Sequence, residues 1–94
     1  MTRSALLALI LVCACRRSAT GVAECDDHLA RRRVCAEQLG GELGASIERE
    51  ADRLQALWTS ASTRNVKGWK DKYGRKWCIA AAADARTAFP ECRW

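Results

Sequence analysis

The chain has 94 residues with six cysteines, one proline and a net charge of +5. A chain of this length forms no more than one small domain, and such a domain buries too little surface to be stable on its hydrophobic core alone. Abundant alanine and scarce proline favour helices over a sandwich or barrel, and cysteines in a small chain favour disulfides. The composition therefore predicts an all-α domain stabilised by disulfides and excludes a multidomain protein.

Residues 1–14 have the composition of a signal peptide. Arg3 supplies the positive start, and the apolar run from Ala5 to Val12 has the length of a signal-peptide core but is too short to span a bilayer. The run ends in the letters VCAC, which resemble the lipobox of bacterial lipoproteins, where the cysteine is acylated and becomes the new N-terminus. This resemblance implies lipidation of Cys15. Cleavage before Cys15 leaves four further cysteines, an even number that suits disulfides.

The motif divides the chain into a signal peptide (1–14), a lipid-anchored tether (15–23) and a helical domain (24–94). The protein is then expected in the bacterial cell envelope, attached to a membrane through its lipid. Cleavage after Ala23 is the alternative and would give a soluble secreted protein, but it would leave Arg16 and Arg17 between the apolar run and the cut. A mitochondrial presequence is disfavoured, because an unbroken aliphatic run is not amphipathic.

A first helix is predicted from near Glu24, because acidic residues gather where the positive end of the helix dipole lies. The glycine pair 40–41 ends it. Its apolar positions are Leu29, Val34, Cys35 and Leu39.

A second helix follows with the clearest amphipathic pattern of the chain, and turn-forming residues at 60–65 end it. A third helix is predicted to start between Val66 and Lys70 and to run to Ala88, with Pro90 ending it. The expected inner face of the second helix consists of Leu43, Ile47, Ala51, Leu54, Trp58 and Ala61.

Short loops between three helices predict an up-down-up bundle, in which the first and third helices run parallel. Cys25 and Cys35 are about 15 Å apart along the first helix. The lower of these should therefore meet Cys78 and the upper one Cys92, so the predicted disulfides are Cys25–Cys78 and Cys35–Cys92. The crossed pairing would place Cys92 about a helix length from Cys25, beyond the reach of a disulfide, and would require an antiparallel hairpin instead.

Cysteines and tryptophans follow a recognisable order: ECD at 24–26, Cys35, Trp58, Cys78 before an alanine-rich helix, and CRW at 92–94. This order resembles a group of small, uncharacterised, exported bacterial helical proteins, many of which carry lipoprotein signals. The resemblance covers most of the mature chain and implies no activity. The step from Cys25 to Cys35 also resembles the twin C-x9-C hairpins of mitochondria, but 13 residues separate Cys78 from Cys92, so the second half of that motif is missing.

Zinc is the chemical alternative for the cysteines, because Cys25, His28 and Cys35 are residue types that bind it. Export favours disulfides, so no metal and no cofactor are predicted, and His28 is expected to be partly exposed without a catalytic role. The sequence contains no nucleophile placed with a base and an orienting acid, no phosphate-binding glycine loop and no paired carboxylates in an apolar setting. We therefore expect a non-enzymatic protein.

Residues 64–77, RNVKGWKDKYGRKW, are the most distinctive stretch, and we call them the basic-aromatic segment. They contain all four lysines of the chain and a single acid, and their aromatic residues recur at every fourth position, on one face of a helix. The aromatics either complete the core, as is more common, or form an interfacial patch that binds anionic lipid, lipopolysaccharide phosphate or another acidic polymer. The candidate residues for such an anionic partner are Arg64, Lys67, Trp69, Lys70, Lys72, Tyr73, Arg75, Lys76 and Trp77.

A shorter basic run, residues 31–33, is predicted to be a solvated helix face, with Glu37 compensating Arg33. The basic clusters would also suit a nucleic acid, but the export signal disfavours that partner, and Trp94 is expected to pack against the bundle. The sequence thus predicts an envelope lipoprotein that acts as a binding or structural module, with an unknown protein partner. The alternative is a soluble secreted protein that binds an anionic lipid or polymer through residues 64–77.

Overall fold

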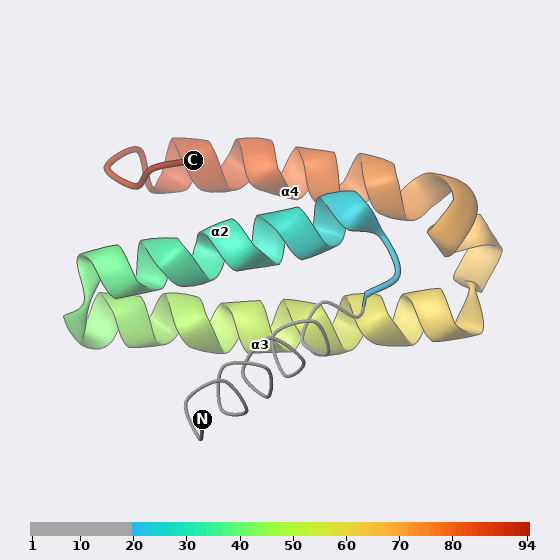
Figure 1. The fold of residues 1–94 in the computed structure, drawn as a ribbon, viewed down its shortest axis with the longest axis horizontal. Helices are drawn as coiled ribbons and strands as arrows, with labels where there is room; N and C mark the ends of the chain where they lie inside the picture. Colours follow the sequence, from blue (N-terminus) through green and yellow to red (C-terminus); the bar gives the residue numbers. More distant parts are fainter. Residues whose placement is uncertain (1–19) are drawn as a thin grey trace, which may run out of the picture.

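The computed structural model describes residues 20–94 and contains three α-helices, α2 (Ala23–Leu39), α3 (Gly41–Arg64) and α4 (Gly74–Ala88). A 3-10 turn, η1 (Val66–Gly68), and a π-helical turn, η2 (Trp69–Tyr73), connect α3 to α4. Figure 1 shows that α2 and α4 run in the same direction and that α3 runs in the opposite one. The predicted all-α, up-down-up bundle is confirmed, while the predicted signal peptide and Cys15 lie outside the described residues.

Helix α2 is the central element of the fold. It lies between α3 and α4 and packs along both of them, whereas contacts between α3 and α4 themselves are sparse (Figure 1). The described helices therefore form a single layer with α2 in the middle, and α3 and α4 do not pack against each other along their length.

The core consists of two clusters, one toward each end of α2, and each cluster contains one disulfide. The first lies where α2 begins and includes the bridge between Cys25 and Cys78. The second lies where α2 ends and includes the bridge between Cys35 and Cys92. The other buried residues of the first cluster are Val22, Leu29, Ala51 and Trp58, and those of the second are Ala36 and Ile47.

Both disulfides have the predicted pairing. The Cα atoms of Cys25 and Cys78 are 4.9 Å apart, and those of Cys35 and Cys92 are 5.3 Å apart. The bridges close loops of 53 and 57 residues, and loops of that size stabilise a fold by about 4 kcal/mol each in the chain-entropy model. These covalent links offset the small core that an open three-helix layer provides.

Gly44 determines how α3 meets α2. A Cβ atom at this position would lie 2.4 Å from the backbone carbonyl oxygen of Ala36, so only glycine allows this approach of the two helices. Because successive residues on a helix point about 100° apart, Leu43 is turned out of the contact and is half exposed. Val34 is exposed in the same way beside the buried Cys35. The prediction that Leu43 lies on the inner face of the second helix was therefore wrong.

The packed part of the chain extends further toward the N-terminus than expected. Thr20 is 1 % exposed, and Val22 belongs to the first core cluster, although both were assigned to the tether. The Thr20 hydroxyl donates to the Asp26 carboxylate at 2.7 Å, and the Thr20 backbone N–H donates to the same oxygen at 3.1 Å. These bonds fasten the segment before α2 to the first turns of the helix.

Candidate functional site

The connection between α3 and α4 has an unusual backbone. Asn65 ends α3 in the left-handed conformation (φ 44°, ψ 47°), and Lys67 adopts φ 51°. Asparagine tolerates this region, while lysine rarely adopts it. The Asn65 side-chain oxygen accepts a hydrogen bond from the Lys70 backbone N–H at 3.0 Å. The side chain of Asn65 thereby joins the end of α3 to the first residues of the π-helical turn.

The π-helical turn is closed by a hydrogen bond from the Gly74 N–H to the Trp69 carbonyl. A Cβ atom at Gly74 would lie 2.7 Å from this oxygen and 3.0 Å from the Trp69 indole nitrogen. The Trp69 ring therefore rests against the Gly74 backbone, where a larger residue does not fit. Such turns often occur at functional sites, and this one directs Trp69 inward to the first core cluster.

Tyr73 and Trp77 are turned outward, with exposed fractions of 44 % and 63 %. The expectation that the aromatics complete the core is thus right for Trp69 and wrong for the other two. Trp77 is exposed because the next residue, Cys78, points toward α2, where it is disulfide-bonded to Cys25. Trp77 itself therefore points about 100° away from the core.

A groove of about 440 Å³ lies between the last turns of α3 and the beginning of α4. We call it the basic-aromatic groove. It brings together five of the predicted anion-binding residues, namely Arg64, Lys67, Trp69, Tyr73 and Trp77. The remaining wall consists of Leu57, Ser60, Ala61 and Val66, which were not predicted. Leu57 lies four residues before Ala61 and seven before Arg64, and this helical spacing could have identified Leu57 and Ala61 but not Ser60 or Val66.

The other four predicted residues lie outside the wall of the groove. The Lys72 ammonium lies 5.5 Å from the centre of the Tyr73 ring, and Arg75 forms an ion pair of 3.1 Å with Glu24 of α2. Lys70 approaches the segment before α2, since a Cβ atom on Gly21 would lie 3.8 Å from its Cε. Lys76 is exposed. These cations surround the same end of the molecule without lining the groove.

His28 is buried, contrary to the prediction that it is partly exposed. Only 1 % of its surface is accessible, and neither ring nitrogen has a hydrogen-bond partner among the described residues. Its ring centre lies 5.9 Å from that of Trp58 and 6.3 Å from that of Trp94, which is stacked on it. Burial, reinforced by the nearby charge of Arg32, lowers the pKa of His28 from 6.5 to about 4. The imidazole is therefore neutral at neutral pH.

The structure rules out a zinc site built on Cys25, His28 and Cys35, because both cysteines are oxidised. Cys25 and Cys35 are both disulfide-bonded, so neither offers the thiolate that binds zinc. Within residues 20–94, no group of three histidine, cysteine or acidic side chains is placed to hold a metal ion.

The arginines of the run 31–33 are held by specific contacts rather than forming a freely solvated face. Arg31 bonds the Asp27 carboxylate at 3.0 Å and the Trp94 backbone carbonyl. Arg32 lies 6.0 Å from the centre of the Phe89 ring. Two of these contacts reach the C-terminal segment, which therefore folds back along α2.

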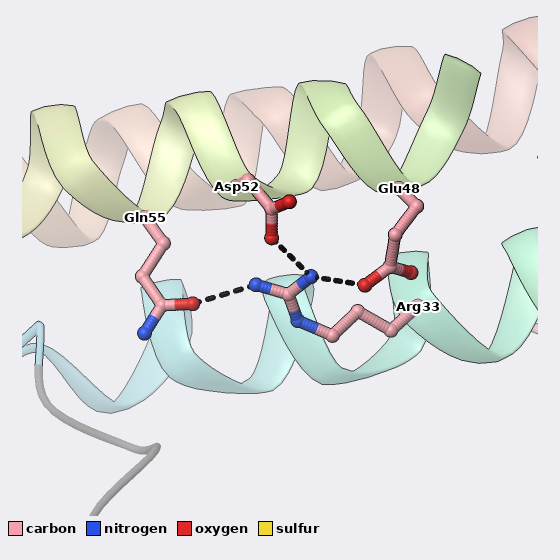
Figure 2. Close-up of polar contacts among 4 residues, drawn as sticks. All are labelled: Arg33, Glu48, Asp52 and Gln55. Atoms are coloured by element: carbon pink, nitrogen blue, oxygen red, sulfur yellow. Dashed lines mark hydrogen bonds and ion pairs between the residues drawn. The ribbon is translucent and has the colours of Figure 1, made fainter. Parts of the chain in front are cut away.

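Arg33 forms a polar cluster with α3 rather than with Glu37 (Figure 2). One guanidinium nitrogen donates to Glu48 at 2.6 Å and to Asp52 at 2.9 Å, and the other donates to Gln55 at 2.6 Å. These residues also border a second hollow of about 460 Å³. Its charged groups already have partners: Arg33 pairs with Glu48 and Asp52, and Asp26 accepts a hydrogen bond from Thr20. The cluster thus joins α2 to α3. Because the charges of this hollow are already paired, the basic-aromatic groove is the better candidate for a binding site.

Comparisons with known proteins provide no match: no family model, no curated protein and no solved structure is similar to the chain. Within the described part of the chain, no helix has both the length and the apolar character needed to cross a membrane.

Proposed function

We propose that the chain is an exported envelope domain, anchored to a membrane by a lipid on Cys15, that acts as a non-enzymatic binding module. Its basic-aromatic groove and the surrounding cations would contact the anionic surface of that membrane. Two disulfides support export, because such bridges persist in oxidising compartments. The lipobox resemblance of residues 12–15 supports the anchor.

The observation that carries the proposal is that the groove and the beginning of the described chain lie at the same end of the molecule. Figure 1 shows the start of α2 beside the connection between α3 and α4, and Gly21 lies against Ser62 and Lys70. Cys15 precedes Thr20 by five residues, and a fully extended chain of that length spans at most about 18 Å. A lipid on Cys15 would hold the basic end of the domain close to the headgroups.

The chemistry of this end suits an anionic lipid surface. Exposed tryptophan and tyrosine are favoured at headgroup depth, and both Tyr73 and Trp77 are exposed there. Each lysine or arginine near an anionic surface contributes about 1 kcal/mol of attraction. Within the basic-aromatic segment only Asp71 is acidic, and it does not line the groove.

Vesicle binding tests the surface. The mature chain, residues 15–94, made with Cys15→Ser so that it carries no lipid, should bind vesicles that contain phosphatidylglycerol, but not vesicles of phosphatidylcholine alone. Glutamine at all four lysines should weaken binding at least a hundredfold, since about 4 kcal/mol of attraction is removed. The lysines to replace are Lys67, Lys70, Lys72 and Lys76.

A control variant with the same change in charge replaces four exposed arginines away from the groove: Arg49, Arg53, Arg86 and Arg93. It should retain most of the binding. Equal losses in the two quadruple variants would show a general effect of net charge and would refute the proposed surface.

Mass spectrometry of the mature protein separates the anchored protein from its alternative. An acylated N-terminal Cys15 supports the anchor. An unmodified chain that begins at Glu24 overturns it and supports the second candidate function, a soluble secreted protein that binds an anionic lipid or polymer through residues 64–77. The exposed Tyr73 and Trp77 favour a binding role in either case.

A further inference from the structure

The basic-aromatic groove has an apolar end and a basic end. Helix α3 runs toward the connection and α4 runs away from it, so Leu57 and Trp77 border the far end while Arg64 and Lys67 border the end at the turn. The wall contains four large hydrophobic residues that are exposed to solvent: Leu57, Val66, Tyr73 and Trp77. Apolar surface is thus concentrated along a hollow whose charge is confined to one end.

The cations of the groove are available to a ligand. Neither Arg64 nor Lys67 forms an ion pair with any described residue. The single acid of the segment, Asp71, accepts a hydrogen bond from the Asn65 amide at 3.4 Å and lies outside the wall. An anionic headgroup at the turn would therefore meet two cations, and the planar guanidinium of Arg64 matches a carboxylate in particular.

The dimensions suit a single hydrocarbon chain. Leu57 and Arg64 are seven residues apart on α3, which corresponds to about 10 Å along the helix. The volume of about 440 Å³ falls in the range of small-ligand sites, about 300 to 1,000 Å³. An apolar trough of this length with cations at one end is complementary to one acyl chain that carries an anionic head.

We propose that the basic-aromatic groove is a binding site for a fatty carboxylate, with its acyl chain along Leu57, Ala61 and Trp77 and its head at Arg64 and Lys67. This inference rests on the proposed function and names a ligand class for the same surface. It differs from adsorption to a bilayer, because it requires saturable binding of a monomeric ligand in the absence of any membrane.

Titration calorimetry with decanoate below its micelle concentration tests the site on the mature chain, residues 15–94, made with Cys15→Ser so that it carries no lipid. One molecule of decanoate should bind per chain. Octanoate should bind about tenfold more weakly, because each buried methylene contributes up to about fourfold in affinity. Decyltrimethylammonium has the same chain with the opposite charge and should bind at least tenfold more weakly than decanoate.

Matched variants locate the ligand. Trp77→Ala should weaken decanoate binding about tenfold, whereas Ile79→Ala, at another exposed apolar position on α4 outside the groove, should not. Replacing Arg64 and Lys67 together with glutamine should abolish the preference for decanoate over decyltrimethylammonium. Because all these side chains are exposed, helical circular dichroism should be unchanged.

The charge control replaces Lys72 and Lys76 with glutamine, which removes the same charge from outside the wall and should preserve the preference. An absence of saturable decanoate binding would overturn the inference, as would equal losses in the groove variants and their controls. Vesicle binding that persists without decanoate binding would overturn this inference alone. Decanoate binding without vesicle binding would overturn only the proposed membrane contact.

Discussion

Acidification should destabilise the protein through His28, which is buried between Trp58 and Trp94. Desolvation opposes the charged form of the imidazole, the charges of Arg32 and Arg86 add to this effect, and Asp27 partly opposes it. The perturbation is a fall in pH from 7.5 to 5, compared between the wild-type protein and His28→Phe. Phenylalanine keeps an aromatic ring in the site and does not titrate.

The magnitude follows from the two pKa values of the histidine. In the unfolded chain the pKa is 6.5, and in the folded protein it is about 4. Between these values the unfolded state binds a proton that the folded state does not, so the free energy of unfolding decreases as the pH falls below 6.5. The loss is about 2 kcal/mol by pH 5 and about 3 kcal/mol once the pH is below 4.

Urea unfolding with the disulfides intact, followed by tryptophan fluorescence, measures this loss. The wild-type protein should lose about 2 kcal/mol between pH 7.5 and 5, and His28→Phe should lose much less. The pKa of Glu50 is lowered by its hydrogen bond from Arg53. Stability from Glu50 is therefore present above the ordinary pKa of 4.5 and is lost only at lower pH, outside the tested window. A variant as sensitive to acid as the wild type, or an NMR midpoint of His28 near 6.5, would refute the reasoning.

Gly44→Ala should destabilise the protein by about 1 to 3 kcal/mol through overpacking, although alanine in place of glycine normally stabilises a helix interior by about 1 kcal/mol. Ser46→Ala, at an exposed position of the same helix, is the control. A Gly44→Ala protein at least as stable as the wild type would contradict the close approach of α3 to α2. Arg33→Met should cost about 1 to 2 kcal/mol in urea unfolding, because Glu48 and Asp52 lose their shared cation. High salt should reduce this difference, and no difference at low salt would show that the cluster contributes nothing. Replacing Cys35 and Cys92 together with alanine should cost about 4 kcal/mol and should shift Trp94 emission to longer wavelength, whereas unchanged emission would show that other contacts hold the C-terminal segment.

The position of α2 explains why a candidate site exists on so small a domain. Since α3 and α4 pack on α2 and only sparsely on each other, the surfaces of α3 and α4 near their connection remain accessible. The disulfides supply covalent stability that a larger shared core would otherwise provide. Apolar residues such as Leu57 and Trp77 can thus remain exposed at the groove without loss of the fold.

Local sequence signals determined the three helices and most of their ends, except that regular α4 begins at Gly74 and not between Val66 and Lys70. Apolar periodicity, the glycines at 40 and 41 and Pro90 act over a few residues, so they predicted the order of elements without tertiary information. The short loops then restricted three helices to one topology, and parallel α2 and α4 allowed only one pairing of the four cysteines. The disulfides were predictable because they depend on axial position along helices, which sequence number supplies directly.

Only the tertiary structure decided which side of each helix is covered. Periodicity identifies an apolar face to within about one residue, or 100°, and the close contact of Gly44 with Ala36 exposes Leu43 where the pattern predicted burial. The burial of His28 depends on Trp58 and on Trp94, which lies 66 residues further along the chain. The groove likewise depends on the π-helical turn, which separates the inward Trp69 from the outward Tyr73 and Trp77. Such features arise from contacts between elements, which a local pattern does not encode.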